Sequence, residues 1–375
     1  MKILLTGGGT GGHFYPVVAV AQALRKVAAE TKLVDVRLYY MAPQPYDRQV
    51  LFDNRIIFIR NTAGKLRRYF SLANFFDLFR TGWGIVTALW SMYFIFPDVV
   101  FGKGGYVSFP VLFAARFYGI PVVIHESDSV PGRMNRWAGK FALRIAVSYV
   151  AAAQFFPKEK VAVTGNPIRQ ELLRPVHEGA REFLELAPAL PVVLVLGGSQ
   201  GAERINESLV DALPRLVEKY QIIHQTGDAN FKKVKALADV ILTGNTHKDR
   251  YKPFASLDVL ALRMAAGAAD LVITRAGSTL FEIAAWGLPA IIIPITNSNG
   301  DHQRENAYNY ARSGAAVVVE ESNLSTTILS SEIERLIDHP AERDTMKKAA
   351  LGFARTDAAD LIAREIIDLA LKHEK

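Results

Sequence analysis

The chain of 375 residues contains no cysteine, which excludes disulfide bonds and thiolate metal sites and fits a reducing compartment. It also lacks a zinc-ligand spacing, a ribonucleoprotein motif and a long Lys/Arg run, so we expect no nucleic-acid partner. Only 22% of the residues are charged and 50% are hydrophobic, which excludes a disordered chain. The N-terminus enters an apolar strand at once, and we expect no signal peptide.

Long hydrophobic runs are also missing. The uncharged stretch from Thr81 to Phe96 is shorter than the ~20 apolar residues that cross a bilayer. It lies beside Lys65, Arg67, Arg68 and Arg80, which are interleaved with aromatic residues. Basic and aromatic residues in this mixture are typical of a helix that lies in a membrane interface. The alternative is a pair of helices that cover a sheet, with their aromatic side chains in its core.

The net charge is +7, which favours anionic partners such as phosphorylated metabolites or an anionic membrane surface.

Two glycine-rich turns also indicate an anionic ligand. Residues 7–12 (Gly-Gly-Gly-Thr-Gly-Gly) follow the apolar run 2–6, and residues 197–201 (Gly-Gly-Ser-Gln-Gly) follow the run 191–196. A strand, a glycine-rich turn and a helix together form an anion site, because backbone N–H groups at the helix N-terminus face the ligand. Two such units predict two α/β domains that face each other across a cleft.

Strands and helices alternate along both halves, and the strands are continuous apolar runs of the kind found in parallel sheets covered on both faces. We expect a helix at 15–27 and strands at 34–40, 98–101, 121–125, 192–196, 221–224, 270–274 and 290–294. Gly, Asn and Pro in the run 164–167 predict the boundary, with domains at 1–164 and 165–356.

The first glycine turn matches the dinucleotide pattern G-x-G-x-x-G, but no acidic residue ends the next strand at Tyr39–Ala42, which disfavours a dehydrogenase. No Gly-Lys-Ser/Thr follows, which excludes a phosphate-loop NTPase. The turn instead presents His13 at a helix N-terminus, where it can act as a general base or only cap the loop. Glu126 and Asp128 follow another strand and can act as acid, base or hydroxyl ligands, or simply cap a helix.

The second half carries a set of residues suited to a nucleotide sugar. Ser278 and Thr279 open a helix and can bind phosphate, and Glu282 can accept from two ribose hydroxyls. Gln303 can pair with a sugar hydroxyl. There is no Asp-x-Asp motif, so we expect no metal, and backbone amides, helix dipoles and a cation such as Arg169 would stabilise the leaving group.

Several motifs then occur in one order: Gly7–His13, Gly104–Ser108, His125-Glu126, Gly165–Arg169, Gly197–Gly201, His224–Gly227, Arg275–Gly277, Glu282–Ala285 and Asp301–Gln303 with Asn306-Ala307. In this order they resemble the MurG family over nearly the whole chain. The resemblance implies an α/β fold of the GT-B type, with two Rossmann-like domains and the active site between them. It also implies that the final helix, within 357–375, packs on the N-terminal domain.

The resemblance implies an inverting hexosyltransferase of peptidoglycan synthesis, without a cofactor or tightly bound metal. Its donor would be UDP-N-acetylglucosamine (UDP-GlcNAc), and its acceptor an undecaprenyl-linked muramoyl-pentapeptide. The enzyme would lie on the cytoplasmic face of the cell membrane as a peripheral protein. The resemblance strengthens the interfacial interpretation of residues 65–96, because the family has a hydrophobic, basic-rimmed patch in this domain.

The family's functional positions carry over residue by residue. Glu282 would bind ribose, Ser199 and Arg169 the phosphates, Gln303 the sugar, and Thr10, Gly11 and Gly12 the donor diphosphate and the acceptor side. The substrate-binding residues that we expect are Thr10, Gly11, Gly12, Asp128, Arg169, Ser199, Gln200, Ser278, Thr279, Leu280, Phe281, Glu282 and Gln303, and the candidate bases are His13 and Glu126.

Three departures from the family pattern affect these assignments. Ser127-Asp128 replaces the frequent Gln-Asn, the loop 275–282 is one residue shorter than usual, and the residue that contacts uracil falls within 257–260 without a defined register. Other functions compatible with the same motifs are a UDP-GlcNAc epimerase, a glycosyltransferase with another lipid acceptor, and a non-catalytic nucleotide-sugar-binding or scaffold subunit.

Overall fold

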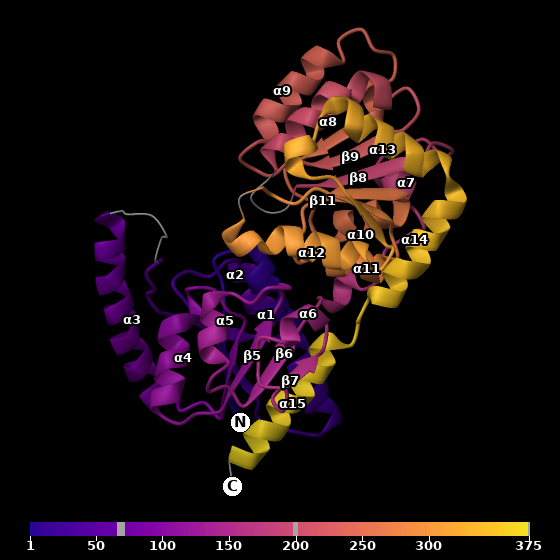
Figure 1. Cartoon of the computed structure of the whole chain (residues 1–375). Coiled ribbons are helices and arrows are strands. Elements are labelled where there is room, and N and C mark those ends of the chain that lie inside the picture. The colour runs from indigo at the N-terminus through magenta and orange to yellow at the C-terminus, as the bar shows by residue number, and fades with distance from the viewer. Residues whose placement is uncertain (66–71, 198–201, 297, 374–375) are drawn as a thin grey trace. The chain divides into compact units, whose positions relative to one another are not determined.

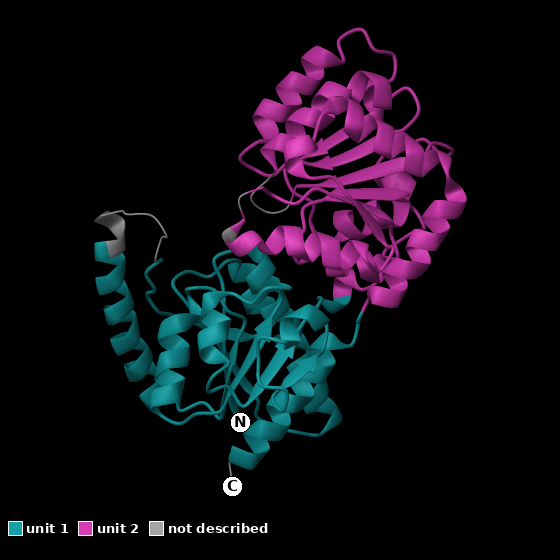
Figure 2. Cartoon of the chain, in the orientation of Figure 1, with its two compact units in different colours: residues 1–170, 355–375 teal, residues 171–354 magenta. Residues whose placement is uncertain are grey.

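The computed structural model describes residues 1–65, 72–197, 202–296 and 298–373, which form two compact units (Figures 1 and 2). The first unit comprises residues 1–170 and 355–375, and the second comprises residues 171–354. Each unit is an α/β sandwich in which helices cover a fully parallel sheet. The predicted α/β class with two parallel sheets is thus confirmed.

The first unit has a seven-stranded sheet in the order β3-β2-β1-β4-β5-β6-β7. Its strands are β1 (Lys2–Thr6), β2 (Arg37–Ala42), β3 (Ile56–Arg60), β4 (Val99–Gly102), β5 (Val122–Glu126), β6 (Arg144–Val147) and β7 (Val161–Val163). Its helices are α1 (Gly11–Glu30), α2 (Arg48–Asp53), α3 (Leu72–Ile95), α4 (Ser108–Phe117), α5 (Arg133–Ala138), α6 (Val150–Ala153) and α15 (Ala358–His373).

Two apolar layers cover this sheet. Alternate side chains of β1 show the arrangement, because Ile3 and Leu5 join the layer of α1 and α15, whereas Leu4 joins the layer of α3 and α4. On α15, apolar residues spaced three and four apart, such as Ile362 and Ile366, face α1. The C-terminal helix thereby returns to the first unit.

The second unit has a six-stranded sheet in the order β10-β9-β8-β11-β12-β13. Its strands are β8 (Val192–Leu196), β9 (Gln221–Gln225), β10 (Tyr251–Phe254), β11 (Leu271–Thr274), β12 (Ala290–Ile292) and β13 (Ala316–Val318). Its helices are α7 (Ala180–Phe183), α8 (Glu203–Leu216), α9 (Phe231–Ile241), α10 (Val259–Ala268), α11 (Thr279–Trp286), α12 (His302–Ala311), α13 (Thr326–Asp338) and α14 (Pro340–Phe353).

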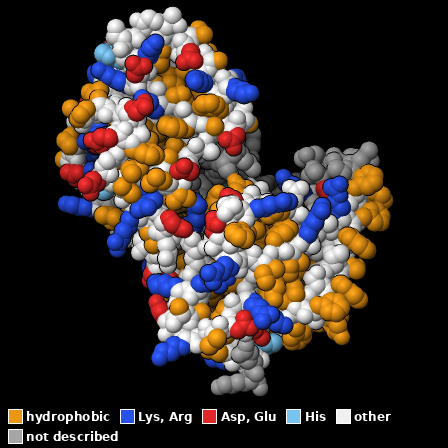
Figure 3. Space-filling model, turned by 180° about the vertical axis from the view of Figure 1, so that it is seen from behind, with side chains coloured by type: hydrophobic (Ala, Val, Ile, Leu, Met, Phe, Trp, Pro, Cys, Tyr) orange, Lys and Arg blue, Asp and Glu red, His pale blue; other side chains and the backbone are white. Residues whose placement is uncertain are grey.

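Helix α3 is apolar on two opposite sides. One side packs through Ala88 and Met92 into the layer shared with α4. The other side exposes large side chains, each more than half accessible: Phe75, Phe76, Leu78, Phe79, Trp83, Val86, Trp90, Tyr93 and Phe94. We call these nine residues the α3 face; in Figure 3 apolar side chains gather along the edge of the first unit that α3 forms. The aromatic residues of α3 therefore do not enter the core, and the covering-helix alternative accounts only for the opposite side of this helix.

Within the described part of the chain, no helix combines the length and the hydropathy that crossing a bilayer requires.

Candidate active site

The first group of predicted residues gathers at one edge of the first sheet. Strand β4 lies between β1 and β5 and all three run parallel, so their carboxyl ends share an edge. Thr10–His13 follow β1, and Glu126 and Asp128 end or follow β5. The edge of a parallel sheet at the carboxyl ends of its strands is where ligands bind in open α/β folds.

His13 lies in the first turn of α1. Its Nδ1 lies 3.1 Å from the hydroxyl oxygen of Thr10, the N-cap residue, whose side chain makes no hydrogen bond to the helix backbone. On the other side of the ring is Gly105, which has φ of +78°. A Cβ added at Gly105 would lie 3.9 Å from Nε2 of His13. The glycine-rich turn 7–12 and the Gly104-Gly105 turn after β4 thus meet at the imidazole.

The Glu126 carboxylate holds the turn that follows β5. Oε1 accepts from the backbone N–H of Asp128 at 2.9 Å, and Oε2 accepts from the N–H of Gly132 at 3.1 Å and from Nδ2 of Asn135 at 2.9 Å. Burial and the nearby Asp128 raise the pKa of Glu126, although these hydrogen bonds oppose the shift. Both oxygens accept hydrogen bonds from the protein, so the carboxylate stabilises the turn 126–132.

Lys103 was not predicted as a site residue, yet it lies inside this group directly after β4. Its backbone N–H donates to Thr6 at 2.8 Å, and its side chain is only 1% exposed. Burial lowers the pKa of its ammonium to about 8, against the opposing attraction of Glu126 and Asp128. The only sequence signal was a lysine between two glycines at a strand end, which does not reveal burial.

Arg169 lies near the end of the first unit, after β7. Its guanidinium carbon lies 3.9 Å from the centre of the Tyr15 ring on α1, and its Nε is buried without a hydrogen-bond partner among the described residues. The predicted phosphate ligand is therefore held by an aromatic ring rather than by a carboxylate, which leaves its positive charge uncompensated at that contact.

In the second unit, the loop after β11 leads into α11. Ser278 is the N-cap residue, Thr279 is the first helical residue, and Glu282 lies in the first turn, all half-buried. Leu280 and Phe281 are buried in the core layer of α10 and α11 or beside it. Substrate contacts at these two positions are therefore limited to backbone groups, because the side chains pack inward.

Gln303 follows β12 at the start of α12. Its carbonyl oxygen accepts from the N–H of Ile295 at 3.2 Å, so its amide NH2 group is the part that can reach a sugar hydroxyl. The same loop is held by Glu321, which accepts from the N–H of Thr296 at 3.0 Å and pairs with Arg275 at 2.5 Å. The Arg275–Glu321 pair, which was not predicted from the sequence, joins the segments after β11 and β13, and Glu321 also holds the loop after β12 through Thr296.

Two predicted substrate-binding residues, the phosphate ligand Ser199 and its neighbour Gln200, lie outside the described residues. Across the described ranges, no three His, Asp or Glu side chains are grouped so as to hold a metal ion.

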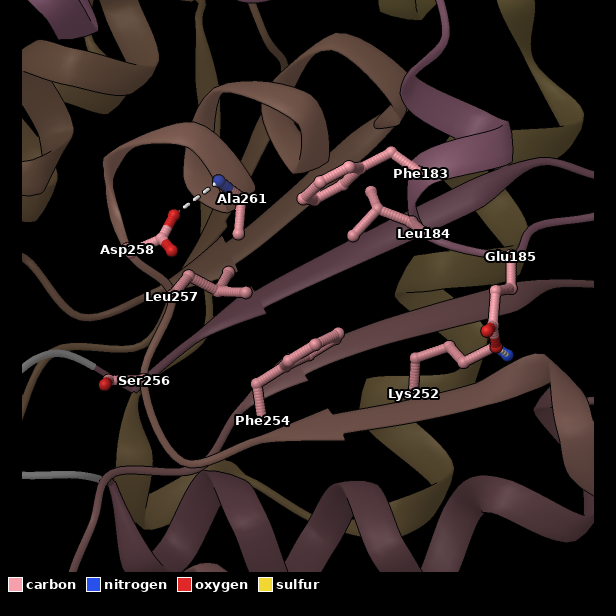
Figure 4. A pocket seen from close by; sticks show the side chains of 9 residues that line it. All are labelled: Phe183, Leu184, Glu185, Lys252, Phe254, Ser256, Leu257, Asp258 and Ala261. Atoms are coloured by element: carbon pink, nitrogen blue, oxygen red, sulfur yellow. Dashed lines mark hydrogen bonds and ion pairs between the residues drawn. The ribbon is translucent and has the colours of Figure 1, made fainter.

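A cavity of about 410 Å³ opens beside β10 in the second unit. In Figure 4, Phe254 and Leu257 face Phe183 and Leu184 across it, with the Lys252–Glu185 ion pair at one end. Ser256 and Asp258 line the other end, where Asp258 caps α10 by accepting from the N–H of Ala261 at 2.8 Å. Leu257 lies within the segment expected to contact uracil.

Comparisons with known proteins cover both units. The glycosyltransferase family 28 N-terminal domain matches residues 3–147, and the C-terminal domain of that family matches residues 192–362. A UDP-N-acetylglucosamine–N-acetylmuramyl-(pentapeptide) pyrophosphoryl-undecaprenol N-acetylglucosamine transferase from Halothermothrix orenii is 36% identical, with 99% of each chain covered.

Solved structures agree with this match. The crystal structure of Acinetobacter baumannii MurG has a TM-score of 0.72 and 26% identity, with 98% of this chain and 99% of that chain covered. A UDP-GlcNAc 2-epimerase from Neisseria meningitidis, bound to UDP-GlcNAc, has a TM-score of 0.66 at 15% identity, which shows a shared fold alone. With both of its domains matched and a curated transferase aligned along its full length, the chain belongs to glycosyltransferase family 28 and, within it, to the MurG family of N-acetylglucosaminyltransferases with the GT-B fold.

Proposed function

We propose that this enzyme transfers N-acetylglucosamine from UDP-GlcNAc to the 4-hydroxyl of an undecaprenyl-pyrophosphoryl-muramoyl-pentapeptide, the step that converts lipid I to lipid II in peptidoglycan synthesis. The observation that carries the proposal is the full-length match to the Halothermothrix orenii transferase, whose name specifies this donor sugar and this acceptor. The polar groups at the carboxyl ends of the two sheets support it.

The donor binds to the second unit. Glu282 accepts from the two ribose hydroxyls, and the hydroxyl and backbone N–H groups of Ser278 and Thr279 face the diphosphate at the N-terminus of α11. The amide NH2 of Gln303 donates to a hydroxyl of the hexose. The cavity beside β10 supplies an apolar slot for uracil, with Phe254 and Leu257 on one side, Phe183 and Leu184 on the other, and Ser256 at one end.

The acceptor binds at the carboxyl edge of the first sheet, where His13 is the general base. In the tautomer that donates from Nδ1 to Thr10, Nε2 carries the basic lone pair. It takes the proton of the muramoyl 4-hydroxyl while that oxygen attacks the anomeric carbon from the face opposite UDP. Glu126 is the weaker candidate base, because both of its oxygens already accept hydrogen bonds from the 126–132 turn and Asn135.

As the new bond forms, the bond between the anomeric carbon and the diphosphate oxygen breaks, and UDP leaves with the electron pair. The sugar is inverted and the product linkage is β. Negative charge grows on the diphosphate, where Arg169 and the start of α11 stabilise it. Losing one such electrostatic contact raises a barrier by ~2.7–4 kcal/mol.

The acceptor is membrane-borne, and the α3 face is the surface that binds the bilayer at its cytoplasmic face. Its Phe and Trp side chains are exposed, and Lys65 and Arg80 beside them are exposed cations. Aromatic side chains with adjacent cations bind an anionic interface through apolar burial and charge attraction.

The decisive assay supplies labelled UDP-GlcNAc and a lipid-linked muramoyl-pentapeptide in vesicles. UDP-N-acetylgalactosamine is the control donor, and a soluble acceptor without a lipid is the control acceptor. The proposal expects the label in a β-linked disaccharide on the lipid. Conversion of the donor alone to a manno-configured sugar would establish an epimerase instead. UDP binding without any transfer would establish a binding subunit.

A further inference from the structure

Lys103 is a buried cation that the proposed chemistry does not use. Its backbone is tied to β1 through Thr6, and Gly7 packs so closely on it that a Cβ at Gly7 would lie 2.6 Å from the Lys103 Cβ. Nζ is enclosed and has no hydrogen-bond partner among the described residues. A charged group placed in the interior is expensive, so its presence requires a compensating anion.

The charged and titratable groups around Lys103 come from three elements. Glu126 at the end of β5 and Asp128 in the following turn attract its ammonium. Burial lowers the pKa of His125 on β5, and so does repulsion from Lys103 and from the His13 imidazole of α1 when that ring is protonated. The imidazole of His125 is thereby kept neutral, and the groups that attract the Lys103 ammonium are the carboxylates of Glu126 and Asp128.

Glu126 can hold its turn only as a carboxylate. Its oxygens accept from two backbone N–H groups and from Asn135, and protonation would convert one accepting oxygen into a donor that faces other donors. Burial and Asp128 both favour that protonation. Lys103 opposes it by charge alone, since no direct hydrogen bond joins Nζ to either carboxylate.

We propose that Lys103 is a positioning residue: its ammonium keeps Glu126 ionised, and the ionised Glu126 holds the 126–132 turn, with Asp128, in the shape that substrate binding requires. The part concerning substrate rests on the proposed function; the part concerning Glu126 and its turn does not.

The ionisation of Glu126, and with it the shape of the 126–132 turn, should depend on pH. A neutral residue at position 103 leaves Glu126 buried beside Asp128 without a cation, so Glu126 takes up a proton at a higher pH than in the unchanged protein. Raising the pH removes that proton and restores the turn. In the unchanged protein the ammonium itself is lost above pH about 8, so the two proteins should become alike in alkaline solution.

The test compares Lys103→Met with the unchanged protein and with Lys158→Met, which removes an exposed lysine of the same unit. Hydrogen exchange of peptides that contain Asp128 and Gly132 is measured from pH 6 to 9. At pH 6–7 we expect the amides of these peptides to exchange about tenfold faster in Lys103→Met than in the unchanged protein, because a change of one unit in a carboxyl pKa is a tenfold change in its protonation equilibrium. At pH 9 we expect no difference between the two proteins. Infrared spectra of Lys103→Met at pH 7 should show a protonated carboxyl band that is absent from Lys103→Met/Glu126→Gln.

A deficit in exchange protection that is the same at every pH, or an unchanged carboxyl spectrum, would overturn the proposal. If Lys103→Met is too unstable at pH 7, the same comparison uses melting temperatures and Lys103→Gln, and the deficit must shrink as the pH rises. These readouts need no transferase activity, so they remain decisive if the proposed substrates are wrong. With active enzyme, the acid limb of the kcat/KM profile should move up by about one pH unit in Lys103→Met and stay in place in Lys158→Met.

Discussion

The guanidinium of Arg169 stacks on the ring of Tyr15, with 3.9 Å between the guanidinium carbon and the ring centre. Tyr15 and His13 lie within one turn of each other on α1. The stack therefore links Arg169, the cation proposed to stabilise the leaving diphosphate, to the helix that carries the proposed base. A cation on an aromatic face keeps its charge available to a phosphate, whereas a carboxylate partner would neutralise it.

Removing this cation should weaken the use of the donor. Arg169→Ala is expected to lower kcat/KM for UDP-GlcNAc about 10²–10³-fold, because the contact strengthens as UDP leaves. Tyr15→Leu should lower it about two- to tenfold through loss of the stack, and Tyr15→Phe, which keeps the ring, should change it little. Steady-state kinetics with varied donor measure this. Equal effects of Tyr15→Leu and Tyr15→Phe would show that the ring face does not position Arg169.

The role of His13 as base predicts a separation of kcat from KM. His13→Gln should lower kcat about 10²–10⁴-fold, because proton transfer to a positioned base contributes that much. Thr10→Val should lower it about two- to tenfold, since it removes the hydrogen bond to Nδ1 and leaves the ring in place. Single-turnover rates with saturating donor and acceptor provide the measurement. A His13→Gln enzyme with the normal rate would assign the base elsewhere.

The α3 face predicts membrane binding that depends on its tryptophans. Trp83→Ser and Trp90→Ser should each weaken binding to anionic vesicles about tenfold, because each removes a large apolar side chain from the interface. Phe52→Ser is the matched control, since Phe52 is exposed on α2, outside the α3 face. Vesicle sedimentation measures the effect. Equal loss of binding in Phe52→Ser would point to general hydrophobicity rather than to this face.

Buried His224 predicts an acid sensitivity of the second unit. Its Nδ1 lies 2.9 Å from the Tyr251 hydroxyl and its Nε2 lies 3.0 Å from Oδ1 of Asn206, and burial lowers its pKa from 6.5 to about 3. The unfolded chain therefore binds the proton more readily than the folded one. The stability due to neutral His224 is complete above pH 6.5 and is lost progressively as the pH falls towards 3.

Between pH 6.5 and 5 this loss should amount to about 2 kcal/mol in the free energy of unfolding. Denaturant titrations of the protein and of His224→Gln measure it, since Gln carries no titrating proton. The variant should be less stable at pH 7 but should lose less stability on acidification. Identical pH slopes in the two proteins would contradict this origin.

Local sequence was sufficient to predict most of the strands that lie in the middle of each sheet. Residues 192–196 form β8 as expected, and the first helix begins at Gly11, four positions before the expected Tyr15, because Gly11 and Gly12 at the end of the turn are already helical. The edge strands were not predicted. β7 (Val161–Val163) and β10 (Tyr251–Phe254) are short and carry exposed or charged residues, so pairing with a neighbour makes them strands.

In the candidate site, too, some features could be predicted from local sequence and others depend on packing. The polar residues after β1, β5 and β11 could be recognised from sequence, because each follows an apolar run and opens a helix. The inward packing of Leu280 and Phe281 could not, because docking of the helix decides which of its sides faces the core. The engagement of Glu126 with its own turn likewise depends on Asn135, which lies on the next helix.

By itself the sequence determined the family, the α/β class and the positions of the glycine-rich turns, because these depend on the order of residues along short stretches. Only the tertiary structure decided which side of α3 is exposed, which residues of α15 pack against α1, and that Lys103 is enclosed beside two carboxylates. Burial and charge pairing arise between residues far apart in the chain, so they exist only after the sheets and helices have packed.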